Sequence, residues 1–195
     1  MCDLLQDLPT IIIPYVQFFT LPSKSLFHNL ISLIISQKIR FSQSRKIRQQ
    51  LYALLNTNEY TIDNLDSLSN DTLKSVGLSD DKINCIRSIL KIENLTLDKI
   101  SKIKGVGPWT LKALQILTDA NDDLFLSEDY YIRQRFSELI QSNKILTTKQ
   151  LDNYIVKFPN WIGQKTVISR FFWRIKPEGI IHLLQTLTLT RDDFL

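Results

Sequence analysis

The chain has 195 residues, enough for one globular unit or two small lobes with a sizeable core. Its hydrophobic content of 44% and charged content of 23% are ordinary for a folded domain. A net charge of +4 and a pI near 9.0 are compatible with a polyanionic partner without demonstrating one. Two cysteines and two histidines exclude a disulfide scaffold, a four-cysteine metal centre and any zinc spacing.

The first residues and the longest apolar run of the chain bear on the location of the protein in the cell. The first residues lack the basic region that opens a signal peptide. The longest apolar run, Leu30–Ile35, is far too short to span a bilayer. We therefore expect an intracellular protein in a reduced setting, with no membrane partner.

Helical periodicity dominates the sequence, and no segment alternates as a strand does. Gly77 follows one periodic segment as a C-cap residue. The pattern predicts an all-α protein of about eight to ten helices. The expected helices lie over Ser25–Ser36, Ser42–Leu55, Leu73–Val76, Asp80–Lys91, Leu97–Ile103, Trp109–Leu117, Asp129–Gln141, Thr147–Lys157, Trp161–Arg174 and Pro177–Leu187.

The turn Gly105-Val106-Gly107-Pro108 joins two of these predicted helices. The two glycines allow positive φ and close approach of the backbone, and Pro108 suits the first turn of a helix. N–H groups at such a helix start can bind a phosphate oxygen. Positive charge flanks the turn at Lys102, Lys104 and Lys112 and gathers earlier at Lys38, Arg40, Arg45, Lys46 and Arg48. Most such runs are solvated faces, but the coincidence with a phosphate-ready turn favours a nucleic acid partner.

Asp129 stands where the next predicted helix begins and ends an acidic stretch, here called the acidic loop, that also contains Asp119, Asp122, Asp123 and Glu128. Asp is a favoured N-cap residue, so a purely structural role would explain it. A carboxylate at this position is also favoured in its charged form by the helix dipole. A phosphate-binding turn combined with such a carboxylate is what an enzyme acting on a nucleic acid backbone requires.

Gly105-Val106-Gly107 and its flanking helices resemble the helix–hairpin–helix motif. With Asp129 behind the acidic loop, the chain resembles the helix–hairpin–helix/Gly-Pro-Asp superfamily of DNA base-excision glycosylases. The resemblance runs from about Leu21 to Arg174. Three segments are similar to its 3-methyladenine (alkyl-base) branch: Ile34-Ile35-Ser36-Gln37 to the first-helix signature, Leu126–Phe136 to the catalytic loop, and Trp161–Trp173 to the C-terminal helix.

The resemblance implies two helical lobes with the active-site cleft between them. It implies one glycosylase domain over residues 1–195, with the hairpin motif at about 97–118 and the catalytic loop at about 119–131. Asp129 is then the catalytic residue, which stabilises the sugar cation and orients the attacking water. The hairpin backbone at Gly105, Val106 and Gly107, supported by Lys104 and Thr110, would hold a DNA phosphate. Its carbonyls would bind a structural Na⁺ or K⁺ in some relatives, and no other cofactor is expected.

Trp109 stands where bifunctional relatives carry a Schiff-base Lys, so the resemblance implies base release without a strand nick. Lys112 lies one turn later and is the nearest amine. Trp109, Tyr130 and Trp173 would form an aromatic pocket for a cationic flipped base. A core role is the alternative for each of them, and it is the one we expect for Trp161, Phe171 and Phe172.

Gln37-Lys38-Ile39 matches the loop that fills the gap left by the extruded base. Bacterial relatives place an apolar wedge directly after the Gln, whereas this chain has Lys38. Either Ile39 replaces the wedge or the Lys38 stem fills the gap.

The resemblance thus implies a monomeric, monofunctional glycosylase that excises chiefly 3-methyladenine, with 7-methylguanine as a further candidate, from damaged double-stranded DNA. A non-catalytic helix–hairpin–helix DNA-binding protein is the first alternative. The two differ in one respect, because only the glycosylase requires Asp129 to open onto an aromatic cleft. A bifunctional glycosylase/lyase is the second alternative and is disfavoured by Trp109.

Overall fold

The computed structural model describes residues 2–20 and 24–194, so Leu21, where the family resemblance begins, lies outside them. Regular structure in the described ranges is helical apart from one isolated antiparallel bridge between Ile175 and Phe194. The all-α prediction is therefore confirmed. No helix within these ranges is long and apolar enough to cross a membrane.

The chain divides into two compact units. Ser23–Thr118 forms one, here called the hairpin unit because it holds the glycine turn. Met1–Pro22 and Asp119–Leu195 together form the other, here called the acidic-loop unit because it holds Asp129. The two helical units agree with the predicted pair of lobes, and the single glycosylase domain stays a prediction.

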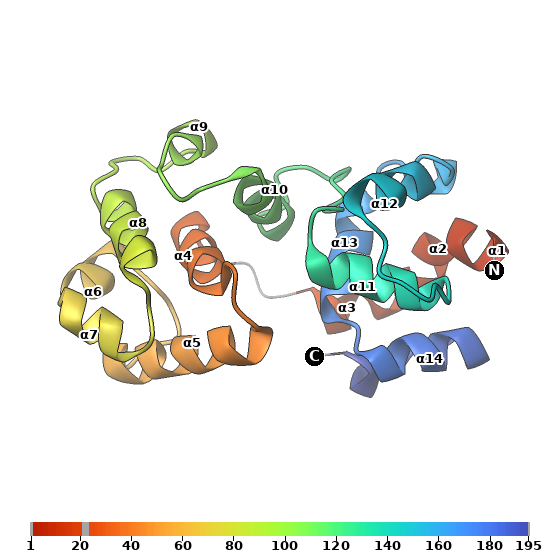
Figure 1. Ribbon diagram of the computed structural model, residues 1–195, viewed down its shortest axis with the longest axis horizontal. Helices are drawn as coiled ribbons and strands as arrows, with labels where there is room; N and C mark the ends of the chain where they lie inside the picture. The colour runs from red at the N-terminus through yellow and green to blue at the C-terminus, as the bar shows by residue number, and fades with distance from the viewer. Residues whose placement is uncertain (1, 21–23, 195) are drawn as a thin grey trace. The chain divides into compact units, whose positions relative to one another are not determined.

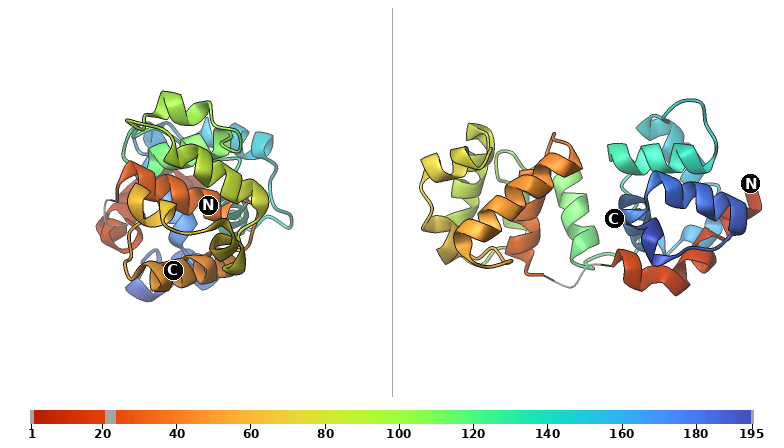
Figure 2. Two further views of the ribbon diagram at one scale, coloured as in Figure 1. Left: turned by 90° about the vertical axis from the view of Figure 1, so that its left-hand side faces the viewer. Right: turned by 90° about the horizontal axis from the view of Figure 1, so that it is seen from below.

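The hairpin unit is built around α4 (Leu26–Ser36), most of whose apolar residues are buried. Helices α5, α8 and α10 all pack against it, and Figures 1 and 2 show this arrangement. Ser25 caps α4 by accepting a hydrogen bond from the His28 amide, as its place before the apolar run predicts. The other helices of the unit are α5 (Phe41–Leu55), α6 (Ile62–Asp66), α7 (Asn70–Ser75), α8 (Asp80–Leu90), α9 (Leu97–Ser101) and α10 (Pro108–Leu117).

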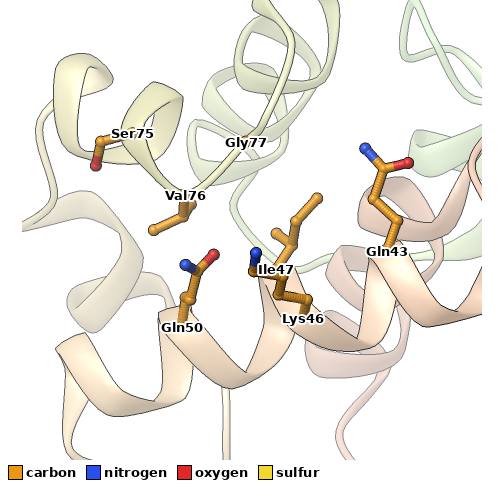
Figure 3. Close-up of a pocket in the computed structure, with 7 residues that line it drawn as sticks. All are labelled: Gln43, Lys46, Ile47, Gln50, Ser75, Val76 and Gly77. Carbon is orange, nitrogen blue, oxygen red and sulfur yellow. The ribbon is translucent and has the colours of Figure 1, made fainter.

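Gly77 ends α7 in the left-handed conformation (φ +98°), as predicted for a C-cap glycine. Its amide and that of Leu78 donate to the Lys74 and Leu73 carbonyls, which closes the turn toward α8. A surface hollow of about 280 Å³ lies between this turn and α5, lined by Lys46, Ile47 and Gln50 among others (Figure 3). None of the site residues predicted from the sequence lines this hollow.

The acidic-loop unit packs around α13 (Lys165–Arg174), which contacts α2, α3 and α11. Trp161, Phe171 and Phe172 are buried, so their predicted core role is confirmed. The Trp161 indole also donates to the Leu5 carbonyl at 2.7 Å, which ties the N-terminal helices to the core. The remaining elements are α1 (Cys2–Gln6), α2 (Leu8–Ile12), η1 (Ile13–Tyr15), α3 (Val16–Phe19), α11 (Tyr130–Leu139), α12 (Thr148–Ile155), η2 (Pro159–Trp161), α14 (Pro177–Thr186) and η3 (Arg191–Asp193).

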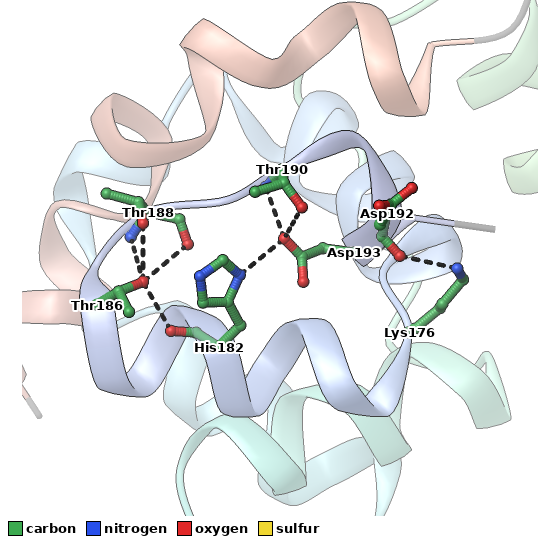
Figure 4. A network of polar contacts seen from close by, with 7 residues as sticks. All are labelled: Lys176, His182, Thr186, Thr188, Thr190, Asp192 and Asp193. Carbon is green, nitrogen blue, oxygen red and sulfur yellow. Dashed lines mark hydrogen bonds and ion pairs between the residues drawn. The ribbon is translucent and has the colours of Figure 1, made fainter.

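Asp193 fastens the C-terminal segment onto α14 (Figure 4). Its carboxylate accepts hydrogen bonds from the Thr190 amide and hydroxyl and pairs with His182 Nδ1 at 2.9 Å. Burial by itself raises the pKa of Asp193, but these partners outweigh it and hold the pKa below its usual value. Gly179 permits the contact, since a Cβ there would stand 2.7 Å from the Asp193 carbonyl.

The predicted helix count was too low, because fourteen α-helices lie in the described ranges. The segment 2–19 breaks into short helices around Pro9 and Pro14, which hides their periodicity. The helix predicted over Trp161–Arg174 is also divided. A left-handed Gly163 (φ +75°) separates η2 from α13.

Candidate functional site

The α9–α10 turn confirms that a glycine with positive φ is needed, but at only one of its two glycines. Gly105 has φ +99°, whereas Gly107 is extended (φ −102°, ψ 178°) and is the N-cap of α10. Of the two glycines that allow positive φ, only Gly105 therefore adopts it. Pro108 occupies the first position of α10 as predicted.

The two glycines also differ in their surroundings. A Cβ on Gly105 would lie 3.2 Å from the Cys85 sulfur, so this glycine lets α8 pack under the turn. A Cβ on Gly107 would meet nothing within 4 Å among the described atoms. Val106 closes the turn by donating to the Ile103 carbonyl at 3.0 Å. Gly107 thus leaves open the approach to the start of α10, which no described side chain caps.

Gln37 connects the end of α4 to this turn. Its Nε2 donates to the Gly105 carbonyl and to the Thr110 hydroxyl, each at 2.9 Å. Thr110 is only 2% exposed, so any support it gives to a phosphate contact is indirect, through Gln37. Lys104 and Val106 lie closer to the surface, since Lys104 is exposed and Val106 is half-buried.

The loop after Gln37 is held at its base by two cations: Lys82, which the sequence did not single out, and Arg48, which belongs to the basic cluster predicted from it. Lys82 Nζ donates to the Ile35 carbonyl at 2.6 Å, and Arg48 donates to Ser36 Oγ at 2.9 Å. Burial lowers the pKa of Lys82. Lys38 then adopts φ +55°, which is uncommon for a residue with a side chain, and is exposed. Ile39 is half-buried, and the choice of wedge between the two stays a prediction.

Asp129 is the N-cap of α11, as its sequence position predicts. It is 7% exposed, and its Oδ1 accepts a hydrogen bond from the Ile132 amide at 3.0 Å. Its own amide donates to the Leu126 carbonyl at 3.1 Å, forming the turn that delivers the carboxylate. The capping role is therefore confirmed, and the bond from the Ile132 amide holds the buried carboxylate in one orientation.

The three aromatic residues predicted to form the base pocket differ in their exposure. Tyr130 is 53% exposed and stands edge-on to Tyr131, with ring centroids 5.8 Å apart. Trp173, on α13 of the same unit, is half-buried. Trp109 is also half-buried but belongs to the hairpin unit. The core alternative therefore fails for Tyr130, while the shared pocket stays a prediction.

The groups that fasten the acidic loop to α13 were not predicted from the sequence. Asp123 accepts hydrogen bonds from the Gly163 amide and the Lys165 ammonium, each at 2.7 Å. Burial raises the pKa of Asp123, but these bonds outweigh it and lower the pKa overall. Thr166 and Ser169 bond the loop backbone farther along. Their spacing on one buried helical face was the available signal.

The hairpin carbonyls fit a monovalent cation only in part. The Ile103 and Gly105 carbonyls each accept a protein hydrogen bond and keep one further lone pair. Within the described residues no three His, Cys, Asp or Glu side chains gather as metal ligands. A structural Na⁺ or K⁺ on these carbonyls therefore stays a prediction.

The fold defined by these helices is that of the helix–hairpin–helix DNA glycosylases. The Schizosaccharomyces pombe 3-methyladenine DNA glycosylase in complex with abasic DNA matches with a TM-score of 0.64 and 21% identity, covering 79% of this chain and 84% of that chain. The DNA-3-methyladenine glycosidase of Bacillus halodurans matches with a TM-score of 0.60 and 19% identity, covering 96% and 94%. These likenesses establish the fold.

Sequence comparison gives the same class of relative. DNA-3-methyladenine glycosylase 1 of Schizosaccharomyces pombe is 23% identical over 173 aligned residues, which cover 80% of this chain and 74% of that protein. No protein-family model matches the chain. The resemblance drawn from the sequence is confirmed in that its curated and structural relatives are 3-methyladenine DNA glycosylases.

Proposed function

We propose that this protein is a monofunctional DNA glycosylase that flips alkylated purines out of double-stranded DNA and hydrolyses their N-glycosidic bonds. The observation that carries the proposal is Asp129, a buried carboxylate oriented by a helix N-terminus beside the exposed ring of Tyr130. The 3-methyladenine glycosylases among its relatives support the same reaction.

Asp129 has the properties that base departure requires of a catalytic carboxylate. As the base leaves, the sugar develops positive charge, which a fixed anion stabilises without reorganising. The same carboxylate can orient or deprotonate the attacking water. An alkylated purine already carries positive charge, so its departure needs little acid assistance. The proposed substrates are therefore 3-methyladenine and 7-methylguanine, which are cationic as nucleotides.

The aromatic residues supply the proposed recognition of the base. Trp109, Tyr130 and Trp173 present electron-rich rings, on which a cationic base stacks better than a neutral one. Trp109 also occupies the place at which lyase relatives carry their amine. We therefore infer base release that leaves the abasic strand intact.

The hairpin supplies sequence-independent binding in this proposal. The start of α10, with Gly107 open in front of it and Lys104 exposed nearby, fits a DNA phosphate. A Na⁺ or K⁺ on the hairpin carbonyls would add positive charge there. We further propose that the protein acts as a monomer, inside the cell and in a compartment that contains DNA.

Release of free bases from methylated DNA tests the proposal. Duplex DNA treated with a methylating agent is incubated with excess protein, and released purines are separated and quantified by mass spectrometry. We expect 3-methyladenine in the soluble fraction and abasic sites in the DNA. Tight binding to methylated DNA with no release would instead support the non-catalytic DNA-binding alternative.

A further inference from the structure

We propose that Ser169 is a positioning residue for Asp129, fixing the loop turn that delivers the carboxylate to its substrate. This inference rests on the proposed glycosylase function. Ser169 is 0% exposed, lies on α13, and is separated from Asp129 by 40 positions in the sequence numbering.

The hydroxyl of Ser169 bonds the acidic loop twice. It accepts a hydrogen bond from the Leu126 amide and donates one to the Leu124 carbonyl, each at 3.2 Å. The Leu126 carbonyl in turn accepts the Asp129 amide at 3.1 Å. Leu126 is thus held by Ser169 on one side and holds Asp129 on the other, so the serine connects to the Asp129 backbone through one residue.

Thr166 does the same work one turn earlier on α13. Its hydroxyl accepts from the Leu124 amide at 3.1 Å and donates to the Asn121 carbonyl. The two hydroxyls therefore each bond one amide and one carbonyl of the extended loop, as a neighbouring strand would. Loss of either hydroxyl removes one bond to a loop amide and one to a loop carbonyl.

The bonds to Thr166 and Ser169 follow the loop in chain order toward Asp129. From Thr166 to Ser169 along α13, the bonded loop amide advances from Leu124 to Leu126. Trp173 is the next residue of the same helical face, one turn beyond Ser169. Beyond Leu126 the loop turns into Asp129, so the hydroxyls hold the loop that ends at the carboxylate onto the helix that carries the proposed base-stacking Trp173.

This relation matters for rate because electrostatic stabilisation depends on a fixed geometry. A displacement of about 1 Å caused by a remote substitution can reduce a rate by about 100-fold. Ser169→Ala removes both bonds to the loop but does not change Asp129, which can still accept the Ile132 amide as the N-cap of α11. We expect it to lower the single-turnover rate of base release by about 10- to 100-fold.

Ser137→Ala is the matched control. Ser137 is 2% exposed in the same unit, and its hydroxyl also bonds the backbone twice. It donates to the Arg133 carbonyl at 2.7 Å and accepts from the Leu146 amide at 2.9 Å, away from the acidic loop. Both variants lose a buried bridging hydroxyl, so we expect similar falls in melting temperature. Only Ser169→Ala should slow base release, with unchanged affinity for abasic DNA.

The assay is run with saturating protein, well below both melting temperatures, together with amide hydrogen exchange at Asp129 and Ile132. Equal rates for Ser169→Ala and Ser137→Ala, with equal exchange, would overturn the inference. If the wild-type protein releases no base, the proposed function fails, and faster exchange in Ser169→Ala alone still establishes the mechanical link. Should Ser169→Ala not fold, Thr166→Val keeps the side-chain shape and should slow release less, because it acts farther from Asp129. No slowing by that variant would count against the inference.

Discussion

Gln37 donates a hydrogen bond of 2.9 Å to the Gly105 carbonyl, joining the end of α4 to the glycine turn. A second bond from the same nitrogen reaches Thr110 on α10, so both amide hydrogens serve the turn. The two segments expected to contact DNA, Gln37–Ile39 and Gly105–Gly107, are therefore fastened together within the hairpin unit. A substitution in either segment should therefore alter the conformation of the other.

Alanine substitution of the two hairpin glycines should separate folding from binding. Gly105→Ala forces a side chain into positive φ and against Cys85, so we expect destabilisation of about 1–3 kcal/mol. Gly107→Ala should leave stability unchanged but weaken binding to damaged and undamaged DNA alike, by about tenfold, because its Cβ blocks the approach of a phosphate. Thermal melting and fluorescence anisotropy with both duplexes measure the two effects. A Gly107→Ala protein that lost only its preference for damage would contradict the phosphate role.

Asp129→Asn should nearly abolish base release and preserve the fold. The amide oxygen of Asn can still accept the Ile132 N–H, and Asn is as good an N-cap as Asp. Only the negative charge is lost, so the transition state loses stabilisation while DNA binding stays the same or tightens. We expect single-turnover release to fall by about 100-fold or more. Retention of most of the wild-type rate would remove Asp129 from catalysis.

The proposed monofunctional reaction predicts that the abasic product stays uncut. A Schiff base needs an amine within reach of the sugar carbon, and the resemblance implies that Trp109 stands where lyase relatives carry one. Incubation with abasic duplex and borohydride should give neither strand cleavage nor a covalent complex on a denaturing gel. Lys112, partly exposed on α10, is the amine to test. Robust trapping that disappears in Lys112→Ala would place the protein in the bifunctional class.

His28 should make the hairpin unit less stable in mild acid. It is buried in a stack with Tyr60, with ring centroids 5.0 Å apart, and its Nδ1 accepts the Tyr60 amide at 3.0 Å. Burial, aided by the charge of Lys24, lowers the pKa of His28 below 6.5. The unfolded chain therefore binds the proton first, and stability falls as pH drops below about 6.5 toward the lower folded pKa.

Urea unfolding of the wild type and of His28→Phe between pH 8 and pH 5 measures this contribution. The Phe variant keeps the stacked ring but cannot titrate, and it will be less stable at every pH because the Tyr60 amide loses its acceptor. The wild type should lose more stability than the variant between pH 7 and pH 5. Parallel curves would show that His28 takes up its proton equally in both states.

The sequence by itself determined most helices and the location of Asp129. Four of these features are local: α4 itself, its Ser25 cap, the start of α10 at Pro108 and the start of α11 after Asp129. They follow from apolar periodicity and from caps that act within one turn of the backbone. The core role of Trp161 was predictable as well.

Only the tertiary structure decided which groups hold these local elements in place. Gly105 rather than Gly107 has positive φ, and a Cβ on Gly105 would also meet Cys85 of a different helix. Gln37 bonds a carbonyl 68 residues away, and Ser169 bonds an amide 43 residues away. Such bonds join segments whose separation along the chain erases any local pattern. A serine or glutamine reads the same in a sequence whether it faces water or another helix, so its role is fixed only when packing brings its partner within hydrogen-bonding distance.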